Sequence, residues 1–285
     1  MTGAALTIAE SYAVCEQVAR SQAKNFYYSF LLLDAERRSA MCAVYAFMRY
    51  CDDLSDSESV PDRAAAIARW RQDLEGALDG RMPEHALWPA FIDTVARYRI
   101  PHKYFFDMID GVSSDLEPRR VRTFAELYDY CYHVASVVGL TIIHIFGFDS
   151  PEALKLAEKC GIAFQLTNIL RDVREDAGNN RVYLPEEELE RFHVTAEELR
   201  GSVVSSHLKE LLAFEAARAR EYYRESAPLV EMIHADSRAS LRALIGIYSR
   251  LLDRIVASHY DVLAQRVRVP TWEKTWILAR SRWSR

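Results

Sequence analysis

Apolar residues recur at spacings of three and four along almost the whole chain, which is the periodicity of helices that bury one face. The pattern predicts helices over residues 8–23, 35–54, 61–79, 84–99, 102–115, 123–147, 150–176, 205–226, 228–260 and 271–282. No alternating segment predicts a strand, and the least helical stretch, 177–203, is the best candidate for a functional loop. We therefore expect one all-α domain over residues 1–285.

Composition agrees with a helical protein and excludes some functions. Half of the chain is apolar, while Gly (10) and Pro (9) are few for 285 residues, which favours long helices. The net charge of −5 comes from interspersed acidic and basic residues, unlike the basic face of a nucleic-acid-binding protein, so no nucleic-acid partner is expected. The five cysteines form no CxxC pair, which is typical of reduced thiols in the cytoplasm.

Membrane association is the property that the sequence leaves most open. The N-terminal segment has no basic region ahead of an apolar stretch, so no signal peptide is expected, and the apolar run 134–148 is too short and polar for a membrane span. The C-terminal end combines aromatic and basic residues: Arg266, Arg268, Trp272, Lys274, Trp276, Arg280, Arg282, Trp283 and Arg285. Either a terminal helix packs its aromatic side, or this end makes peripheral contact with the inner face of a membrane.

A first acidic segment closes the predicted helix 35–54. Asp52 and Asp56 are four residues apart, so their carboxylates share one helix face, which Arg49 joins. Like charges at this spacing, at a helix end where the dipole is negative, disfavour a free helix. A bound Mg²⁺ would offset both costs, since this ion takes oxygen ligands and bridges phosphates. A solvated acidic helix end is the alternative interpretation.

A second acidic segment repeats the arrangement in more detail. Gln165, Asn168, Asp172 and Asp176 follow one another at spacings of three, four and four, and form a polar stripe on a largely apolar helix. Buried polar groups need partners, which a hydrated magnesium–diphosphate cluster would supply. A stripe that faces solvent or the bases of another helix is the alternative. Two such segments facing each other inside an apolar bundle fit an isoprenoid diphosphate, with an oily tail and a diphosphate head.

Basic and aromatic residues could complete such a site. Arginine is suited to bidentate phosphate contacts, and the candidate cations are Lys24, Arg49, Arg171, Arg181 and Arg266. Tyrosines could steer protons or face a carbocation, and the candidates are Tyr45, Tyr130, Tyr183 and Tyr248. Any one of the cations could instead be a surface charge, which is a weaker alternative for Arg171 and Arg181 than for Lys24 and Arg266. Each tyrosine taken alone is more often a core tyrosine. No Ser-His-Asp arrangement, P-loop or GxGxxG motif is present.

At these residues the chain resembles the squalene/phytoene synthase family. The matching pieces are Lys24-Asn-Phe26-Tyr, Tyr45 to Asp56, Tyr130 to Gly139, and Gln165 to Asp176 followed by Arg181-Val-Tyr183-Leu-Pro185. The resemblance extends from residue 12 to 282 and is most specific from Asn168 onward. It implies an all-α isoprenoid-synthase bundle with a central apolar cavity and about three Mg²⁺ ions at the diphosphates.

The resemblance also implies roles for individual residues. The metal ligands would be Asp52, Asp56, Asn168, Asp172 and Asp176. The diphosphate would be held by Lys24, Arg49, Arg171, Arg181 and Arg266. The reacting centre would be lined by Tyr45, Tyr130, Gln165, Tyr183 and Tyr248. Many relatives carry another acid directly after the first motif, where this chain has Ser57, but metal binding is expected to survive because Asp52 and Asp56 remain.

The reaction that the resemblance implies is a transferase reaction that joins two prenyl diphosphates head to head (1'-1) through a cyclopropyl intermediate. The tail length would be set by Phe26, Phe30, Cys42 and Gly139, with the small Cys42 leaving room and Phe30 reducing it. Two farnesyl diphosphates giving presqualene diphosphate or a squalene-type C30 product are slightly favoured, as in hopanoid biosynthesis. Alternatives are a phytoene synthase of carotenoid biosynthesis using geranylgeranyl diphosphate, a terpene cyclase or head-to-tail elongator, and a non-catalytic assembly factor. NADPH use and oligomeric state stay open.

Overall fold

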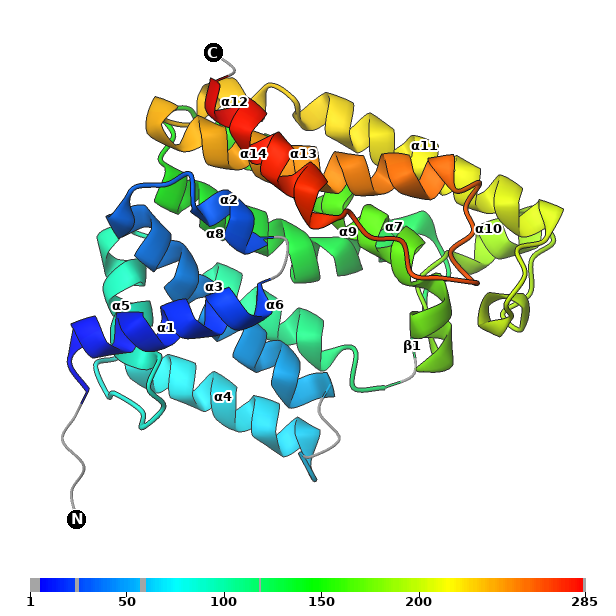
Figure 1. Ribbon diagram of the computed structural model, residues 1–285. Helices are drawn as coiled ribbons and strands as arrows, with labels where there is room; N and C mark the ends of the chain where they lie inside the picture. The colour runs from blue at the N-terminus through cyan, green and yellow to red at the C-terminus, as the bar shows by residue number, and fades with distance from the viewer. Residues whose placement is uncertain (1–5, 24–25, 57–59, 118, 284–285) are drawn as a thin grey trace.

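The chain folds as a succession of helices, seen in a computed structural model that describes residues 6–23, 26–56, 60–117 and 119–283 (Figure 1). The helices of the first half are α1 (Ile8–Gln22), α2 (Phe26–Phe30), α3 (Ala35–Asp56), α4 (Arg63–Leu78), α5 (Trp88–Arg97), α6 (Lys103–Ser113), α7 (Phe124–Cys131) and α8 (Val137–Phe146). Those of the second half are α9 (Glu152–Gly178), α10 (Glu186–Arg191), α11 (Ser206–Ser226), α12 (Leu229–Met232), α13 (Ala235–Ala257) and α14 (Thr271–Trp283). The all-α class predicted from periodicity is confirmed.

The structure differs from the predicted elements where segments are short. The predicted helix 228–260 is divided into α12 and α13, because the backbone is extended at Ile233 and His234. The stretch 177–203 contains α10 and a turn of 3₁₀ helix, η2 (Glu198–Arg200). Two strands of two residues, β1 (Arg119–Arg120) and β2 (Arg181–Val182), pair in parallel. Alternation cannot show in segments of this length, which is why the sequence predicted no strand.

The long helix α9 joins two apolar clusters. It supplies Ala157, Cys160 and Phe164 to a cluster built mainly by the N-terminal helices, where the rings of Phe47 and Phe91 stack 4.3 Å apart. Other residues of α9 belong to a second cluster, which also contains residues of α11 and of the C-terminal part of α13. These α9 residues are Ile162, Leu166, Ile169 and Leu170. Because one continuous helix of 27 residues belongs to both clusters, we propose that the chain is a single domain.

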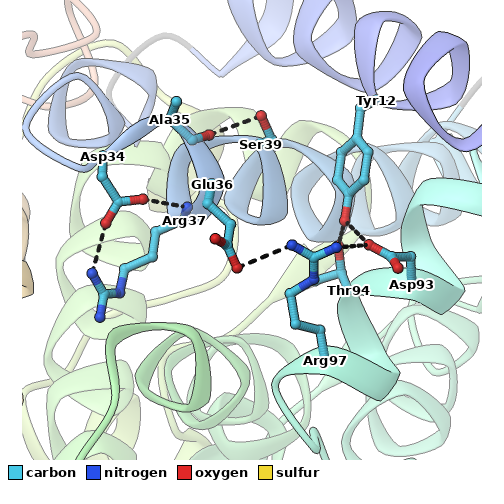
Figure 2. Close-up of polar contacts among 9 residues, drawn as sticks. All are labelled: Tyr12, Asp34, Ala35, Glu36, Arg37, Ser39, Asp93, Thr94 and Arg97. Carbon is cyan, nitrogen blue, oxygen red and sulfur yellow. Dashed lines mark hydrogen bonds and ion pairs between the residues drawn. The ribbon is translucent and has the colours of Figure 1, made fainter.

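Polar contacts fix the N-terminal helices to one another at their outer edge (Figure 2). The Tyr12 hydroxyl on α1 donates to the Asp93 carboxylate on α5, at 2.7 Å. Arg97, one turn further along α5, donates to Asp93 at 2.9 Å and to Glu36 on α3 at 3.0 Å. These contacts hold α1, α3 and α5 in register, so that the opposite face of α3 is presented to the centre of the protein.

The helical stretch from α7 to α8 is interrupted by one turn of π-helix, η1 (Tyr132–Ser136). It is held between two glycines of neighbouring helices. A Cβ at Gly161 of α9 would lie 2.5 Å from the Ser136 Cα, and a Cβ at Gly111 of α6 would lie 3.0 Å from backbone atoms of His133. The hydroxyl of Ser136 donates to the Glu158 carbonyl at 2.8 Å. The π-turn is therefore packed backbone against backbone, an irregularity often found at functional sites.

By length and composition, Phe124–Phe146 could also cross a membrane, a longer stretch than the run 134–148 considered from the sequence. More than half of its most apolar part is buried in the protein, and it packs against α6 and α9. This is the environment of a central helix in a bundle.

A buried cluster of charged residues attaches α10 to α11. Glu188 and Glu215 are 5% and 1% exposed, and both accept hydrogen bonds of 2.6 Å from Arg218. The guanidinium lies 3.8 Å from the centre of the Phe124 ring. Burial and the neighbouring Glu188 carboxyl raise the pKa of Glu215 to about 9, so that one proton and one arginine neutralise the two acids. The cluster thereby fixes the chain that follows β2.

We expect Arg218→Ala to lower the free energy of unfolding by about 3–5 kcal/mol, because it leaves a buried carboxylate without its cation. Arg220→Ala is the matched control on the same helix. Arg220 pairs with Asp253 at the surface, so its loss should cost less than about 1 kcal/mol. Urea denaturation followed by circular dichroism measures both, and equal midpoints for the two variants would contradict the structural role of the cluster.

Candidate active site

A cavity of about 340 Å³ lies among the helices that pack around α3 and α9. The lining residues of α3 are, in order, Met41, Val44, Tyr45, Met48, Arg49, Asp52 and Ser55. Those of α9 are Ala157, Cys160, Gly161, Phe164, Gln165 and Asn168. Along both helices the lining begins apolar and ends polar. The central apolar cavity that the family resemblance implies is thus present. Its polar residues come from the C-terminal part of the lining stretch on α3 and on α9.

Two charged residues of the first acidic segment line the cavity. Asp52 and Arg49 both line it, and Arg49 also pairs with Asp53. The Nε atom of Arg49 is buried without a hydrogen-bond partner. A buried guanidinium N–H without an acceptor is costly, so this atom is suited to an anionic ligand in the cavity. Asp56 ends α3, but its side chain lies outside the described residues, as does the whole of Lys24.

The upper part of the second acidic segment faces the same cavity. Gln165 and Asn168 line it, and the Asn168 Nδ2 atom donates to the Gln165 Oε1 atom at 3.4 Å. The Oδ1 atom of Asn168 is buried without a partner. An orphaned acceptor oxygen beside a cavity fits a cation, and the cavity thus presents a donor from α3 and an acceptor from α9 that both need a ligand.

The lower part of this segment lies among arginines. Asp172 accepts 2.8 Å and 2.9 Å contacts from Arg171 and Arg266, and Arg266 also contacts Glu175 at 3.0 Å. Asp176 follows one turn later, and burial together with the charges of Asp172 and Glu175 raises its pKa to about 7. A carboxyl raised in this way by neighbouring acids gains from a bound cation. Arg171, Asp172 and Arg266 line a separate hollow of about 270 Å³ rather than the main cavity, and Arg266 reaches it from the connection between α13 and α14.

Asp115 is a site residue that the sequence reasoning missed. It lines the cavity, and its two carboxylate oxygens each accept a 2.9 Å hydrogen bond, one from the Tyr130 hydroxyl and one from the Tyr183 hydroxyl. The two tyrosine rings stack 4.6 Å apart, and Arg119 lies 4.6 Å from the centre of the Tyr130 ring. The sequence held one indication of Asp115, an acid at the end of the predicted helix 102–115 with two arginines shortly after it. No periodic pattern distinguished this acid from others in the chain.

The short sheet explains how the loop after α9 reaches this point. Pairing of β1 with β2 places Arg119 opposite Arg181, and Arg181 donates to the Asp115 backbone carbonyl at 3.0 Å. Arg181 also lines the cavity. Burial raises the pKa of both Tyr130 and Tyr183 well above the usual range, so these phenols keep their protons and donate to Asp115.

Aromatic rings form another part of the cavity wall. The rings of Phe164 and Tyr248 stack 4.4 Å apart, and Phe26 lies 5.6 Å from Tyr248 and 6.5 Å from Tyr45. Burial raises the pKa values of Tyr45 and Tyr248 to about 12, so both are neutral. The π-faces of such rings can stabilise positive charge in a cavity that excludes water.

One residue of the predicted tail-length pocket lies elsewhere. Phe26, Phe30 and Gly139 line the cavity, whereas Cys42 is fully buried on another side of α3, near Cys15 of α1. The lining residues of α3 follow a spacing of three and four from Met41, and Cys42 is one residue out of that series. The prediction that Cys42 borders the tail pocket is therefore wrong, and helical periodicity was the signal that could have excluded it.

Magnesium fits these residues without a preformed cage. Among the described side chains, no three His, Cys, Asp or Glu residues converge as a complete metal site. Mg²⁺ usually keeps several waters and binds through one or two carboxylates together with substrate phosphates. Asp52 and the unpartnered Asn168 oxygen, with Asp172 and Asp176 further along α9, would be oxygen ligands of that kind.

Comparisons with known proteins identify the family of this chain. A family model described as squalene/phytoene synthase matches residues 19–273. The 15-cis-phytoene synthase of Synechococcus elongatus is 36% identical over 94% of this chain and 91% of its own, and the phytoene synthase of Arthrospira platensis is 35% identical over the same shares. A solved dehydrosqualene synthase is 30% identical, with a TM-score of 0.90 and 96% of both chains covered. Squalene synthase HpnC from Alicyclobacillus acidocaldarius is 27% identical, with a TM-score of 0.83 and 89% and 95% covered.

The matches extend over nearly the whole chain, in sequence and in structure. The solved dehydrosqualene synthase shares the all-α bundle of this protein over almost its full length. The chain belongs to the squalene/phytoene synthase family, the transferases of isoprenoid biosynthesis that condense prenyl diphosphates head to head.

Proposed function

We propose that this protein is a Mg²⁺-dependent phytoene synthase that condenses two molecules of geranylgeranyl diphosphate. The observation that carries the proposal is the pair of unpartnered polar atoms, Arg49 Nε and Asn168 Oδ1, on facing helices of an apolar cavity. One needs an anion and the other a cation, and a magnesium diphosphate provides both. The apolar lining is suited to the prenyl tails.

We propose the length of the prenyl tail from the names of the relatives. This proposal replaces the slight preference for farnesyl diphosphate that was drawn from the sequence. The curated relatives with 35–37% identity are named phytoene synthases, which supports the C40 alternative better than the farnesyl diphosphate that the sequence slightly favoured. Because Cys42 does not line the cavity, its small size is no longer an argument for a longer tail. Phe30 does line the cavity, and we expect the tail length to depend on this side chain. A C30 product remains the second candidate, because the solved dehydrosqualene synthase matches with a TM-score of 0.90.

The residues of the polar end bind the first diphosphate and assist its departure. In the first step the allylic C–O bond of one substrate breaks and its electron pair leaves with the diphosphate. Arg49, Arg181 and the arginines beside Asp172 bind the negative charge that develops there. Bound at Asp52, Asp56, Asn168, Asp172 and Asp176, Mg²⁺ would supply further stabilisation of that charge. Lys24 is proposed as a diphosphate contact from the sequence alone.

The carbocation left behind is protected by the apolar and aromatic wall. The double bond of the second substrate attacks it, and loss of a proton closes the cyclopropyl ring. Phe26, Tyr45, Phe164 and Tyr248 present ring faces to the positive charge and exclude water. Asp115 fixes the Tyr130 and Tyr183 hydroxyls near the polar end, where they can position the second diphosphate or the departing proton.

Product analysis tests the proposal directly. The protein is incubated with geranylgeranyl diphosphate and, separately, with farnesyl diphosphate, each with Mg²⁺ and with or without NADPH, and products are identified by mass spectrometry. We expect a C40 hydrocarbon from geranylgeranyl diphosphate without NADPH. The cyclopropyl intermediate would lose its own diphosphate, rearrange and be quenched by loss of a proton, and none of these steps needs a reductant. A cyclic C15 product, or no diphosphate release from either substrate, would contradict the proposed reaction.

We expect Asp172→Asn to lower turnover at least about 100-fold, because it removes a carboxylate from the proposed metal site. Glu175→Gln is the control, since Glu175 also contacts Arg266 but is exposed. Turnover as a function of Mg²⁺ concentration and thermal melting measure the effects. The assignment is refuted if Asp172→Asn keeps the Mg²⁺ requirement and turnover of the control.

We expect Asp115→Asn to lower turnover about 10- to 100-fold, because an asparagine accepts one of the two phenol hydrogen bonds with its oxygen and leaves the other unmade. Asp110→Asn is the control, since Asp110 lies nearby on α6 but pairs with Arg71 at the surface. Steady-state kinetics with geranylgeranyl diphosphate measures both variants. Equal rate constants would show that the tyrosine pair does not depend on Asp115.

A further inference from the structure

Three of the five tryptophans of the chain are exposed together on α14. Trp272, Trp276 and Trp283 are 68%, 59% and 81% exposed, whereas the other two, Trp70 and Trp88, are buried in the first apolar cluster. Large apolar side chains that gather on one exposed surface usually mark an interaction site.

These tryptophans lie on the side of α14 that points away from the protein. At about 100° per residue they fall within about 40° of one another around the helix. The opposite side is packed: Glu273 is buried between Arg250 and Arg254 of α13, and Ile277 is in contact with Gly246 of α13. Figure 1 shows α14 along the outside of α13. The ion pairs of Glu273 hold the helix so that the tryptophans face outward.

The charge around this face is positive in an otherwise acidic protein. Within α14 there are three basic residues, Lys274, Arg280 and Arg282, and one acidic residue, which is the buried Glu273. The whole chain carries a net charge of −5. Arg280 and Arg282 flank the line of tryptophans on its two sides, by the same 100° rule. A row of tryptophans between arginines is complementary to a surface that is apolar inside and negatively charged outside.

We propose that the outward face of α14, formed by Trp272, Trp276, Arg280, Arg282 and Trp283, binds an anionic phospholipid surface. Tryptophan favours the interface between headgroups and acyl chains, and arginines beside it gain from negatively charged headgroups. Such a helix lies in the plane of the interface with its apolar side immersed. The proposal goes beyond the proposed reaction and does not depend on it.

A second copy of the chain is a less favourable occupant. In a two-fold symmetric dimer the same face of each copy meets the other. Arg280 and Arg282 would then lie close to their own equivalents, while the described part of α14 offers no exposed acid to pair with them. Like charges brought together at an interface oppose binding. An anionic lipid surface carries the opposite charge over its whole area.

Lipid binding by α14 would place the cavity close to the membrane. The helix packs against α2 and α13, and Lys274 lies 5.4 Å from the centre of the Tyr28 ring on α2. Phe26 and Phe30 of α2 and Leu241, Leu244 and Tyr248 of α13 line the cavity. One layer of helices therefore separates the proposed lipid-binding face from the apolar cavity.

The full chain is tested by flotation with vesicles of phosphatidylcholine alone and of equal parts phosphatidylcholine and phosphatidylglycerol. We expect binding to the anionic vesicles, which weakens as salt is raised. Arg280→Glu combined with Arg282→Glu should weaken it at least about 25-fold, since each basic residue near an anionic surface contributes about fivefold. Trp276→Ala combined with Trp283→Ala should weaken binding to a similar degree, and the fluorescence of wild-type protein should shift to shorter wavelength on binding because Trp70 and Trp88 are already buried.

Met82→Ala combined with Val203→Ala is the matched control, since both residues are exposed and apolar but lie far from α14 in the sequence. This variant should bind vesicles like the wild type. The proposal is overturned if the tryptophan and control variants bind equally, or if no vesicle binds the wild type. Analytical ultracentrifugation identifies the other occupant: a dimer that the tryptophan variant abolishes, with no vesicle binding, would assign the face to a second copy.

Discussion

The contact between Gly161 and the π-turn is the constraint on which the site most depends. With a hydrogen in place of a side chain, α9 approaches the backbone of Ser136 so closely that a Cβ would overlap it. This contact fixes the rotation of α9 about its axis just before the polar stripe begins. Gln165 and Asn168 follow within two turns, so they are directed into the cavity rather than toward the second apolar cluster. A rotation of α9 by one residue position, about 100°, would put Leu166 and Ile169 in place of these amides.

Burial makes the polar end of the cavity strongly dependent on its ligands. Asp115 is satisfied within the protein by two phenols and by nearby arginines, and it needs nothing further. Arg49 and Asn168 are different, because each is left with a buried polar atom that has no hydrogen-bond partner within the protein. Hydrogen bonds therefore distinguish Asp115, which the protein itself satisfies, from the two residues that a ligand would complete.

The long helices could be predicted from the sequence, and the loops that complete the site could not. Periodicity placed α3 and α9 within a few residues, and with them Arg49, Asp52, Gln165 and Asn168, because residues three and four apart on one helix must share a face. Asp115, Arg119 and Tyr183 meet through a two-residue parallel sheet and the end of a helix. Such contacts depend on how distant segments pack, and no local pattern records them.

The errors of the sequence interpretation have the same physical origin. Cys42 was assigned to the cavity because it is a small residue on the right helix, yet one position along a helix rotates a side chain by about 100°. The apolar pattern of α3 continues on more than one face, since α1 and α5 bury the others, so apolarity alone does not identify the cavity side. The polar residues Arg49 and Asp52 identify that side.

The unequal stiffness of the cavity walls has a consequence for the evolution of product length. On the side of α9 the wall is backbone packed against backbone at Gly161, and it cannot retreat without displacing the polar stripe. On the side of α2 and α13 the wall consists of side chains such as Phe30 and Leu244, and α14 packs against both of these helices. Substitutions on this softer side can alter the space for a tail while the diphosphate chemistry stays unchanged. Related enzymes could therefore diverge between C30 and C40 products by few changes, confined to one wall.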